Sequence, residues 1–432
     1  MRRNRYRYEE TFEATLRYWL PVFFSLLCII LPAVSSAENQ VTPRIYFGMH
    51  IHHADKDTPW PRIGFGSWRL WDAYVSWADL EPSYGKWDFR RLDEYVRIAH
   101  RQDVSLLLPL GLSPQWASAR PQEKSPYGLG RAAEPREMND WKNYVRTVAR
   151  RYNGIIKDFE IWNEPNSKDF FSGEMDTLVQ LTCEAYRVLK EESPNNIVVS
   201  PAYTGEQNVH LLAEFLAKGG GHCIDVVAYH LYVTPSYPEA IRPLVSKIRK
   251  TMLESGAGHL PLWNTESGWW MANADGTPET GVAPPYWKRI EGDAGAAIVA
   301  RALILGRASG VERFYWYAWD SKILGLIEPR TKSPKTGAYA FQRVADWLQD
   351  KMTPICEEKG GQWVCELMDT NGAPFVIVWS VEKIAGRYMV PDIYRVVNID
   401  HASAGPVTMP PPDQIRSVKT STIPMLISLS KR

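Results

Sequence analysis

Short apolar runs recur along the chain, separated by longer segments in which apolar and polar residues follow a helical spacing. Such short runs are typical of parallel β-strands that are buried on both faces. Eight of them predict strands, at Ile45–His50, Gly64–Trp71, Val104–Leu110, Ile156–Trp162, Ile197–Pro201, Ile224–Leu231, Pro261–Thr265 and Arg313–Trp319.

The segments between these strands predict helices, among them Phe89–Arg101, Glu137–Tyr152, Met175–Glu192, Pro238–Ser255 and Gly292–Arg307. Eight strand–helix units over about 305 residues match a (β/α)8 barrel in order and size, and right-handed crossovers close it. A doubly wound open sheet is the alternative fold. The first strand is followed by no Gly-rich phosphate loop, which disfavours the dinucleotide binding that is usual for such a sheet. We therefore predict an α/β protein with a TIM barrel over residues 41–350.

The pattern changes after a predicted helix at Gly337–Asp350. Short strands separated by Gly and Pro follow, including Trp363–Met368 and Phe375–Trp379. This pattern predicts a small β-sandwich-like domain over residues 353–432.

The first 37 residues are typical of an export signal. Five Arg precede an apolar run from Tyr18 to Val34, and Ser35, Ser36 and Ala37 offer the small residues of a cleavage site. The run contains Pro21 and Pro32 and is shorter than the roughly 20 residues that span a bilayer. We expect an exported protein, periplasmic or secreted, with membrane attachment only if the segment stays uncleaved.

Composition narrows the function classes. The 432 residues are 45% hydrophobic and carry a formal net charge of +1, which gives no long-range field for a phosphate backbone, so nucleic-acid binding is disfavoured. The 18 Trp and 21 Tyr suit ligands that have apolar faces and hydroxyl edges. Sugars are the commonest ligands of this kind.

Four Cys remain after Cys28 leaves with the signal, in a compartment where disulfides persist. Cys356 and Cys365 flank Gly360-Gly361, and a two-residue hairpin loop there places the two Cys directly opposite each other. We predict a disulfide between them, in a non-hydrogen-bonded pair. Cys183 in a helical segment and Cys223 before a strand are interpreted as buried thiols.

Two glutamates stand at the carboxyl ends of predicted strands, where barrel active sites lie. Glu164 follows the fourth strand, and Glu266 ends the seventh, 102 positions later. At about 38 residues per strand–helix unit, they enter one cavity from well-separated sides of the ring. Paired carboxyl groups across a cleft are what glycoside hydrolysis requires. A single glutamate of this kind is more often a surface ion pair, but two among Trp, Asn, Pro and Gly are not explained that way.

The residues around both glutamates resemble a known family. Trp162-Asn163-Glu164-Pro165-Asn166 and Thr265-Glu266-Ser267-Gly268-Trp269 resemble the acid/base and nucleophile motifs of the clan of glycosidases built on (β/α)8 barrels. Ser67-Trp68-Arg69-Leu70-Trp71-Asp72 and Trp77-Ala78-Asp79-Leu80-Glu81-Pro82 are similar to glycoside hydrolase family 39. The resemblance covers most of residues 44–350, and the C-terminal domain is similar to that family's accessory domain.

This resemblance implies a retaining glycoside hydrolase that acts on a polysaccharide or oligosaccharide. It implies that Glu164 is the general acid/base, that Glu266 is the nucleophile, and that the two carboxyl groups lie about 5 to 5.5 Å apart. By the same analogy Asn163 hydrogen-bonds the 2-hydroxyl of the cleaved sugar, with a turn-capping role as the alternative. No cofactor and no metal is implied, because protonation and carboxylate attack complete the reaction.

Other residues near the strand ends are candidates for the site. His230 and Tyr232 share one direction by period-two alternation, so Tyr232 can hydrogen-bond Glu266. Arg69 can hold Glu266 anionic. For His230, Tyr232 and Arg69 a packing or structural ion-pair role stays open. Trp319 is the candidate floor on which a sugar stacks, and Trp116 the candidate for a neighbouring subsite, although most of the Trp are expected in the core.

Two other classes of function stay open. His50-Ile51-His52, with His230 and Asp320, resembles the start of an amidohydrolase metal set, but the expected Lys and His on the fourth and fifth strands are missing. We interpret His50 as a sugar contact on the mouth. A polysaccharide-binding protein without catalysis is the other class, although neither glutamate is replaced. For the substrate we predict endo-cleavage of a bacterial exopolysaccharide, mannose-rich by resemblance to hydrolases of exopolysaccharide synthesis, with an exo-acting β-xylosidase as the alternative.

Overall fold

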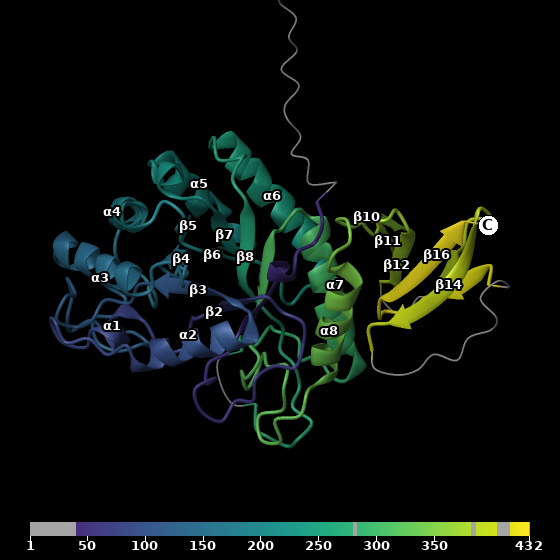
Figure 1. Ribbon diagram of the computed structural model, residues 1–432, viewed down its shortest axis with the longest axis horizontal. Coiled ribbons are helices and arrows are strands. Elements are labelled where there is room, and N and C mark those ends of the chain that lie inside the picture. The colour runs from purple at the N-terminus through teal and green to yellow at the C-terminus, as the bar shows by residue number, and fades with distance from the viewer. Residues whose placement is uncertain (1–39, 280–282, 382–385, 404–414, 432) are drawn as a thin grey trace, which may run out of the picture. The chain divides into compact units, whose positions relative to one another are not determined.

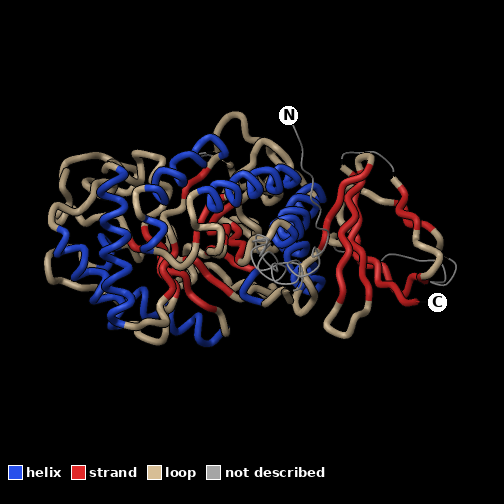
Figure 2. Tube along the Cα trace, turned by 90° about the horizontal axis from the view of Figure 1, so that it is seen from above, coloured by secondary structure: helices blue, strands red, loops and turns tan. Residues whose placement is uncertain are grey.

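The computed structural model describes residues 40–279, 283–381, 386–403 and 415–431. The predicted signal segment at 1–37 lies outside the described residues. Residues Ala37–Arg432 form one compact unit. Its barrel strands lie inside a layer of helices, and strands without helices follow at the C-terminal end (Figure 1, Figure 2).

The barrel strands form one parallel sheet of nine elements in the order β5-β4-β3-β2-β1-β9-β8-β7-β6. They are β1 (Phe47–His50), β2 (Ser67–Arg69), β3 (Ser105–Leu110), β4 (Asp158–Ile161), β5 (Ile197–Val199), β6 (Tyr203–Thr204), β7 (Val227–His230), β8 (Leu262–Ser267) and β9 (Arg313–Trp316). Every strand predicted from the apolar runs is present.

The ring closes through an interrupted strand. β5 pairs with β4, while β6, four residues further along the chain, pairs with β7. A parallel bridge between Val199 and Val226 joins the two sides of this gap. β5 and β6 are therefore two pieces of the predicted fifth strand. Counted together as one strand, they make the sheet the eight-stranded barrel of the predicted fold class.

The helices cover the outside of this sheet. They are α1 (Trp77–Leu80), α2 (Arg90–Gln102), α3 (Met138–Arg151), α4 (Met175–Glu192), α5 (Val209–Ala217), α6 (Ile241–Glu254), α7 (Asp293–Ala308) and α8 (Thr336–Leu348), with 3-10 turns η2 (Arg44–Tyr46), η3 (Glu206–Asn208), η4 (Gly220–Cys223) and η5 (Pro238–Ala240). α7 is buried along nearly all of its length, and its buried residues include Arg301 and Arg307. Among the described helices, none has the length and apolarity needed to cross a membrane.

The C-terminal strands form two antiparallel sheets. One has the order β10-β11-β12-β16-β14, and the other pairs β13 with β15. The strands are β10 (Ile355–Lys359), β11 (Gln362–Met368), β12 (Pro374–Ser380), β13 (Arg387–Met389), β14 (Tyr394–His401), β15 (Ser417–Lys419) and β16 (Met425–Lys431). The predicted β domain is present, and the exact boundary between 350 and 353 stays a prediction.

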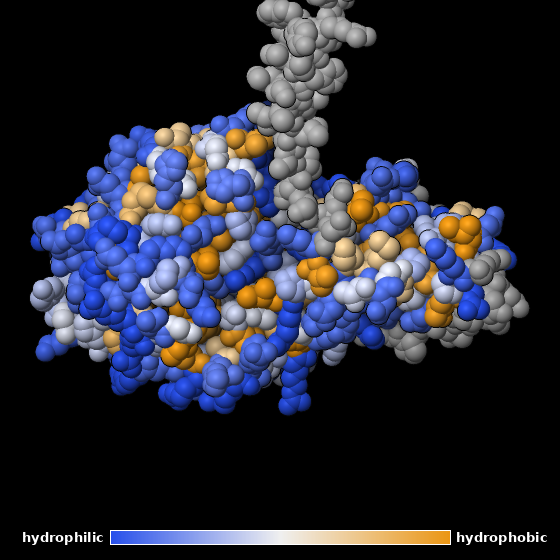
Figure 3. Space-filling model, turned by 45° about the horizontal axis from the view of Figure 1, so that its top comes forward, coloured by the Kyte–Doolittle hydropathy of each residue, from blue (hydrophilic) through white to orange (hydrophobic). Residues whose placement is uncertain are grey.

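Alternation along β12 divides this region between two cores. Val376 and Val378 face a core shared with β13 and β15, while Ile377 and Trp379 join the core of the barrel helices. Period-two alternation in a strand covered on both faces produces this pattern. In the space-filling view of Figure 3, hydrophilic residues cover most of the face, and hydrophobic residues form small separate patches.

Two disulfides cross-link the described part of the chain. Cys356 and Cys365 are bonded and stand opposite each other where β10 pairs with β11, in the register that the two-residue loop requires. Cys183 and Cys223 are also bonded, so their interpretation as buried thiols is wrong. α4 carries Cys183 and η4 carries Cys223, and the packing of these elements, 40 positions apart in sequence, was not readable from local patterns.

Candidate active site

A cavity of about 880 Å³ is formed by residues that follow the barrel strands. The two predicted catalytic glutamates line it, and so does Asn163. The loop after β7 adds Tyr232, Val233 and Thr234. Aromatic side chains make up much of the wall, namely Trp71, Tyr127, Phe170, Tyr286, Trp287 and Tyr317. A few polar groups within apolar walls are typical of sites that orient a small ligand.

The backbone bends sharply where β4 ends. Trp162 has φ 64° and Glu164 has φ 39°, both in the left-handed region that residues other than Gly rarely adopt. The amide of Glu164 donates to the carbonyl of Ala202 at 2.9 Å, and the indole N–H of Trp162 donates to the carbonyl of Phe170 at 2.7 Å. Strained backbone of this kind is concentrated at functional sites, where surrounding contacts hold it.

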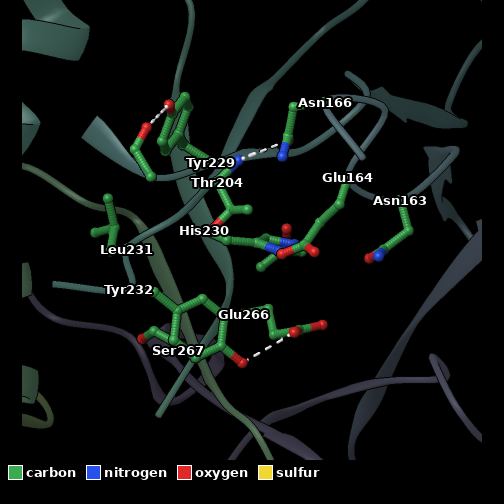
Figure 4. Close-up of polar contacts among 12 residues, drawn as sticks. Asn163, Glu164, Asn166, Thr204, Tyr229, His230, Leu231, Tyr232, Glu266 and Ser267 are labelled. Atoms are coloured by element: carbon green, nitrogen blue, oxygen red, sulfur yellow. Dashed lines mark hydrogen bonds and ion pairs between the residues drawn. The ribbon is translucent and has the colours of Figure 1, made fainter. Parts of the chain in front are cut away.

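Glu164, His230 and Glu266 converge in the cavity (Figure 4). One side-chain ligand atom from each residue lies within 4.8 Å of the other two. A carboxylate oxygen of Glu164 is therefore within 4.8 Å of one of Glu266. This separation suits a pair in which one carboxyl attacks the sugar directly, because it leaves no room for a water between them.

The guanidinium of Arg69 organises the floor of the site. Its Nε donates to Glu160 at 2.5 Å, its Nη1 to Glu266 at 2.9 Å and its Nη2 to the amide oxygen of Asn163 at 2.6 Å. Arg69 is wholly buried, and although burial opposes its charge, the carboxylates of Glu160 and Glu266 raise its pKa. Because the amide oxygen of Asn163 is engaged, its NH₂ group is the part that can donate to a sugar hydroxyl.

Two side chains from the end of β7 hold the glutamates. The hydroxyl of Tyr232 donates to Glu266 at 2.9 Å, and Nδ1 of His230 lies 2.7 Å from Glu164 (Figure 4). Burial lowers the pKa of His230 to about 4, so its imidazole is neutral at pH 7. The structure thus brings Arg69, His230 and Tyr232 to the two glutamates.

Burial sets the protonation of the glutamate pair. It raises the pKa of Glu164 and of Glu266 to about 7, and the charge of Arg69 opposes this at both. One proton is therefore held near neutral pH. Glu266 accepts hydrogen bonds from Arg69 and Tyr232, which favours its ionised form, so the proton resides on Glu164.

Three predicted sugar contacts lie away from the cavity. Trp319 is buried, and its indole N–H donates to the carbonyl of Pro59. The indole N–H of Trp116 donates to the carbonyl of Glu81 at 2.9 Å, and its ring packs edge-on against neighbouring aromatic rings. His50 is wholly buried, with Nε2 2.9 Å from the carbonyl of Thr265. These interpretations are corrected because Trp319, Trp116 and His50 are absent from the cavity lining and each bonds a backbone carbonyl elsewhere in the fold.

Sequence reasoning missed four residues that the structure places in or below the cavity. Glu160 accepts from Arg69 and from the hydroxyl of Thr265. Asp72 accepts from the hydroxyls of Tyr127 and Tyr317. The signal for Glu160 was its place within a buried strand, where a charged side chain requires a partner. Tyr317 and Trp319 lie two positions apart and so have the same direction in an extended strand. Which of the two faces the cavity depends on where the strand ends.

The residues of the amidohydrolase alternative do not assemble. Asp320 accepts the backbone amides of His52 and His53 and the hydroxyl of Thr58, so it fixes the loop after β1. Within the described part of the chain, the one group of three possible metal ligands is Glu164, His230 and Glu266. That group is the predicted catalytic glutamate pair together with the histidine that contacts Glu164.

Comparisons with known proteins agree with this geometry. The family model for glycosyl hydrolases family 39 matches residues 73–275, a span that contains both glutamates. A β-xylosidase of Caldicellulosiruptor saccharolyticus is 31% identical over 113 residues, which are 24% of this chain and 23% of that protein. The match thus spans about a quarter of each protein.

Solved structures share the fold. A family 39 glycoside hydrolase from Bacteroides cellulosilyticus WH2 has a TM-score of 0.69 at 18% identity, covering 92% of this chain and 82% of its own. A monomeric β-xylosidase from Caulobacter crescentus CB15 has a TM-score of 0.60 at 16% identity, with 91% and 98% covered. A GH30 endoxylanase from Clostridium papyrosolvens C71 reaches 0.58 at 11% identity, with 92% and 98% covered. The solved structures confirm the predicted fold class, and the family model confirms the resemblance to family 39 over residues 73–275.

Proposed function

We propose that this chain, a glycoside hydrolase similar to family 39, cleaves glycosidic bonds by a retaining double displacement. In this reaction Glu164 is the general acid/base and Glu266 is the nucleophile. The observation that carries the proposal is the approach of the two carboxyl groups to within 4.8 Å in a cavity, with cationic and hydroxyl donors on Glu266 alone.

In the first step Glu164 gives its proton to the oxygen of the leaving sugar. Oε of Glu266 attacks the anomeric carbon, the glycosidic bond breaks, and a glycosyl ester of Glu266 forms while the leaving sugar departs as an alcohol. Arg69 and Tyr232 keep Glu266 ionised and oriented for this attack.

In the second step the ester is hydrolysed. Formation of the ester removes the negative charge of Glu266, and Glu164, now ionised, takes a proton from water. The resulting hydroxide attacks the anomeric carbon and releases Glu266 as a carboxylate, so the sugar keeps its starting configuration. The neutral imidazole of His230 accompanies Glu164 in both protonation states, because its Nδ1 can accept from the acid or donate to the carboxylate.

We propose xylose-containing glycans as the first substrate class. Support comes from three of the similar proteins, which are described as two β-xylosidases and an endoxylanase. The sequence-based idea of endo-cleavage of a mannose-rich bacterial exopolysaccharide draws no support from these comparisons and stays a prediction. Export to the periplasm or the medium likewise remains a proposal that rests on the sequence of residues 1–37.

The test is hydrolysis of 4-nitrophenyl β-xyloside, xylan, mannan and a bacterial matrix polysaccharide, followed by reducing-end release and product sizing. Wild type is compared with Glu164→Gln and Glu266→Gln, and with Glu254→Gln as a matched control, because Glu254 lies on the exposed end of α6. We expect activity in wild type and control only. Glycan binding without hydrolysis by wild type, unchanged in all variants, would instead indicate a carbohydrate-binding protein.

A further inference from the structure

A second cavity of about 400 Å³ adjoins the first. The two cavities share five lining residues, namely Trp71, Asp72, Pro126, Tyr127 and Tyr317. The rest of the second cavity is formed by the loops after β1, β2 and β3, including His52, His53 and Arg131. The retaining mechanism uses none of these three residues.

The wall between the cavities is a hydrogen-bonded bridge. The hydroxyl of Tyr127 donates to Oδ1 of Asp72 at 2.7 Å, and the hydroxyl of Tyr317 donates to Oδ2 at 2.5 Å. These residues come from the loops after β3, β2 and β9, so the bridge crosses the end of β1, which lies between β2 and β9 in the sheet. Two of the roughly four acceptor positions of the carboxylate are used by the tyrosines. The remaining positions can accept from sugar hydroxyls.

The second cavity also contains an unsatisfied imidazole. Within the described part of the chain, Nε2 of His52 has no hydrogen-bond partner, although the atom is buried. The ring packs 5.0 Å from the ring of Tyr317, next to the bridge. Buried polar atoms in folded proteins nearly always have a partner, and this nitrogen can bond a hydroxyl of a ligand.

The position of Glu164 indicates whether the second cavity binds the leaving-group side or the non-reducing side of the substrate. Its amide is bonded to Ala202, just before β6, and the first cavity continues from there over Thr204, Gly205 and Glu206. The acid protonates the leaving group, so the leaving group lies on this side. The bridge, over β1 and β2, is on the opposite side of the cleaved sugar, where the non-reducing part of the substrate lies.

We propose that the second cavity is a sugar-binding subsite for the unit that precedes the cleaved unit. It receives a neutral sugar whose hydroxyls bond to Asp72 and His52. The enzyme then releases a disaccharide or longer product rather than one monosaccharide. This inference rests on the proposed function, since it needs a glycosidase in which Glu164 is the acid.

The test compares 4-nitrophenyl β-xyloside with 4-nitrophenyl β-xylobioside on the full-length protein. We expect the xylobioside to give nitrophenol and intact xylobiose as first products, with a kcat/KM at least about 10-fold higher than that of the xyloside. The His52→Ala variant should lose most of this advantage and leave the kcat/KM of the xyloside unchanged. His100→Ala is the control, because His100 is exposed near the end of α2.

The order of products from wild type decides the proposal even if a variant fails to fold. Xylose as the first product of the xylobioside, or an equal kcat/KM for both compounds, would overturn the subsite. Hydrolysis of neither compound would contradict xylose as the sugar, which is a failure of the proposed function. The same pair of aryl glycosides, made with the sugar found by reducing-end release, then tests the subsite.

Discussion

Nη1 of Arg69 donates a hydrogen bond of 2.9 Å to Oε2 of Glu266; Arg69 is wholly buried, and Glu266 lines the cavity. The same guanidinium also bonds Glu160 and Asn163, so one cation fixes the proposed nucleophile, a supporting carboxylate and the proposed contact to the 2-hydroxyl. Only a planar fork of donors reaches three acceptors in fixed directions.

Substitution of Arg69 should lower kcat/KM and also shift the pH dependence of the reaction. In Arg69→Lys the charge stays but the fork is lost, and we expect kcat/KM to fall by about 100-fold or more, as for the loss of charged hydrogen bonds of about 3 kcal/mol. Arg69→Gln also removes the charge that opposes protonation of Glu266. The acidic limb of its pH profile should therefore move to higher pH, which a purely structural role would not produce.

Arg97→Gln on the exposed face of α2 is the control for Arg69→Gln, because Arg97 pairs with Glu94 on the same helix. Thermal unfolding of each variant separates loss of fold from loss of activity. An acidic limb at the same pH in wild type and Arg69→Gln would contradict the role given to Arg69.

The activity should fall as the pH rises through neutrality. Glu164 must be protonated to act as the acid, and burial raises its pKa to about 7. Activity is therefore present below this pKa and lost above it. A 2,4-dinitrophenyl glycoside, whose leaving group needs no acid, should keep its glycosylation rate above pH 7. Pre-steady-state release of dinitrophenol measures this rate, and an alkaline limb of equal depth for both substrates would contradict the assignment.

Glu164→Gln should stabilise the protein at alkaline pH. The unfolded chain loses the proton of Glu164 near the ordinary value of 4.5, whereas the folded protein keeps it to about 7. Ionisation between these values favours unfolding, so the folded state loses stability as the pH rises. Glutamine does not ionise. We expect Tm of the variant to exceed that of wild type by about 2 °C or more at pH 8, with a smaller difference at pH 4.5.

Glu254→Gln, at an exposed glutamate of α6, should change Tm little at either pH. A Tm gain for Glu164→Gln that is the same at pH 4.5 and pH 8 would show that removal of a charge is not its cause.

Azide should rescue the two glutamate variants with opposite stereochemistry. In Glu266→Ala the space of the nucleophile is open, so azide attacks the sugar once and gives a glycosyl azide of inverted configuration. In Glu164→Ala the glycosyl ester still forms, and azide replaces water in the second displacement, which gives retained configuration. NMR of the products distinguishes the two. Retention from Glu266→Ala would reverse the assigned roles.

The barrel was predictable from sequence because each strand is a short apolar run between helical patterns, and buried parallel strands leave this trace locally. Glu164 and Glu266 were predictable because strand ends in a barrel meet at one mouth. The joint role of Arg69 was predictable only in part: its contact to Glu266 follows from neighbouring strand ends, but its contact to Glu160 depends on which face of β4 turns inward.

The wrong interpretations of Trp319 and His50 share one physical cause. Trp319 and Tyr317 have the same alternation, and the choice between core and cavity depends on where β9 ends, at Trp316. His50 is likewise at the last position of β1, below the mouth rather than on it. An error of one or two residues at a strand end exchanges a cavity residue for a core residue, and propensity does not fix such ends.

The disulfide between Cys183 and Cys223 should stabilise the protein more than the hairpin disulfide does. It closes a loop with a sequence separation of 40, whereas Cys356 and Cys365 close one of 9. Because a cross-link restricts the unfolded chain more when the loop is longer, replacing the first pair by Ser should cost about 4 kcal/mol and replacing the second about 2.5 kcal/mol. Chemical unfolding of the two double variants measures both costs.

The longer loop also contains β6 and the cavity residues Thr204 to Asn208, so the Cys183→Ser, Cys223→Ser variant should lose activity at a lower temperature than the hairpin variant. Equal losses of stability from the two pairs would mean that local packing around the cysteines, and not loop closure, sets their contribution.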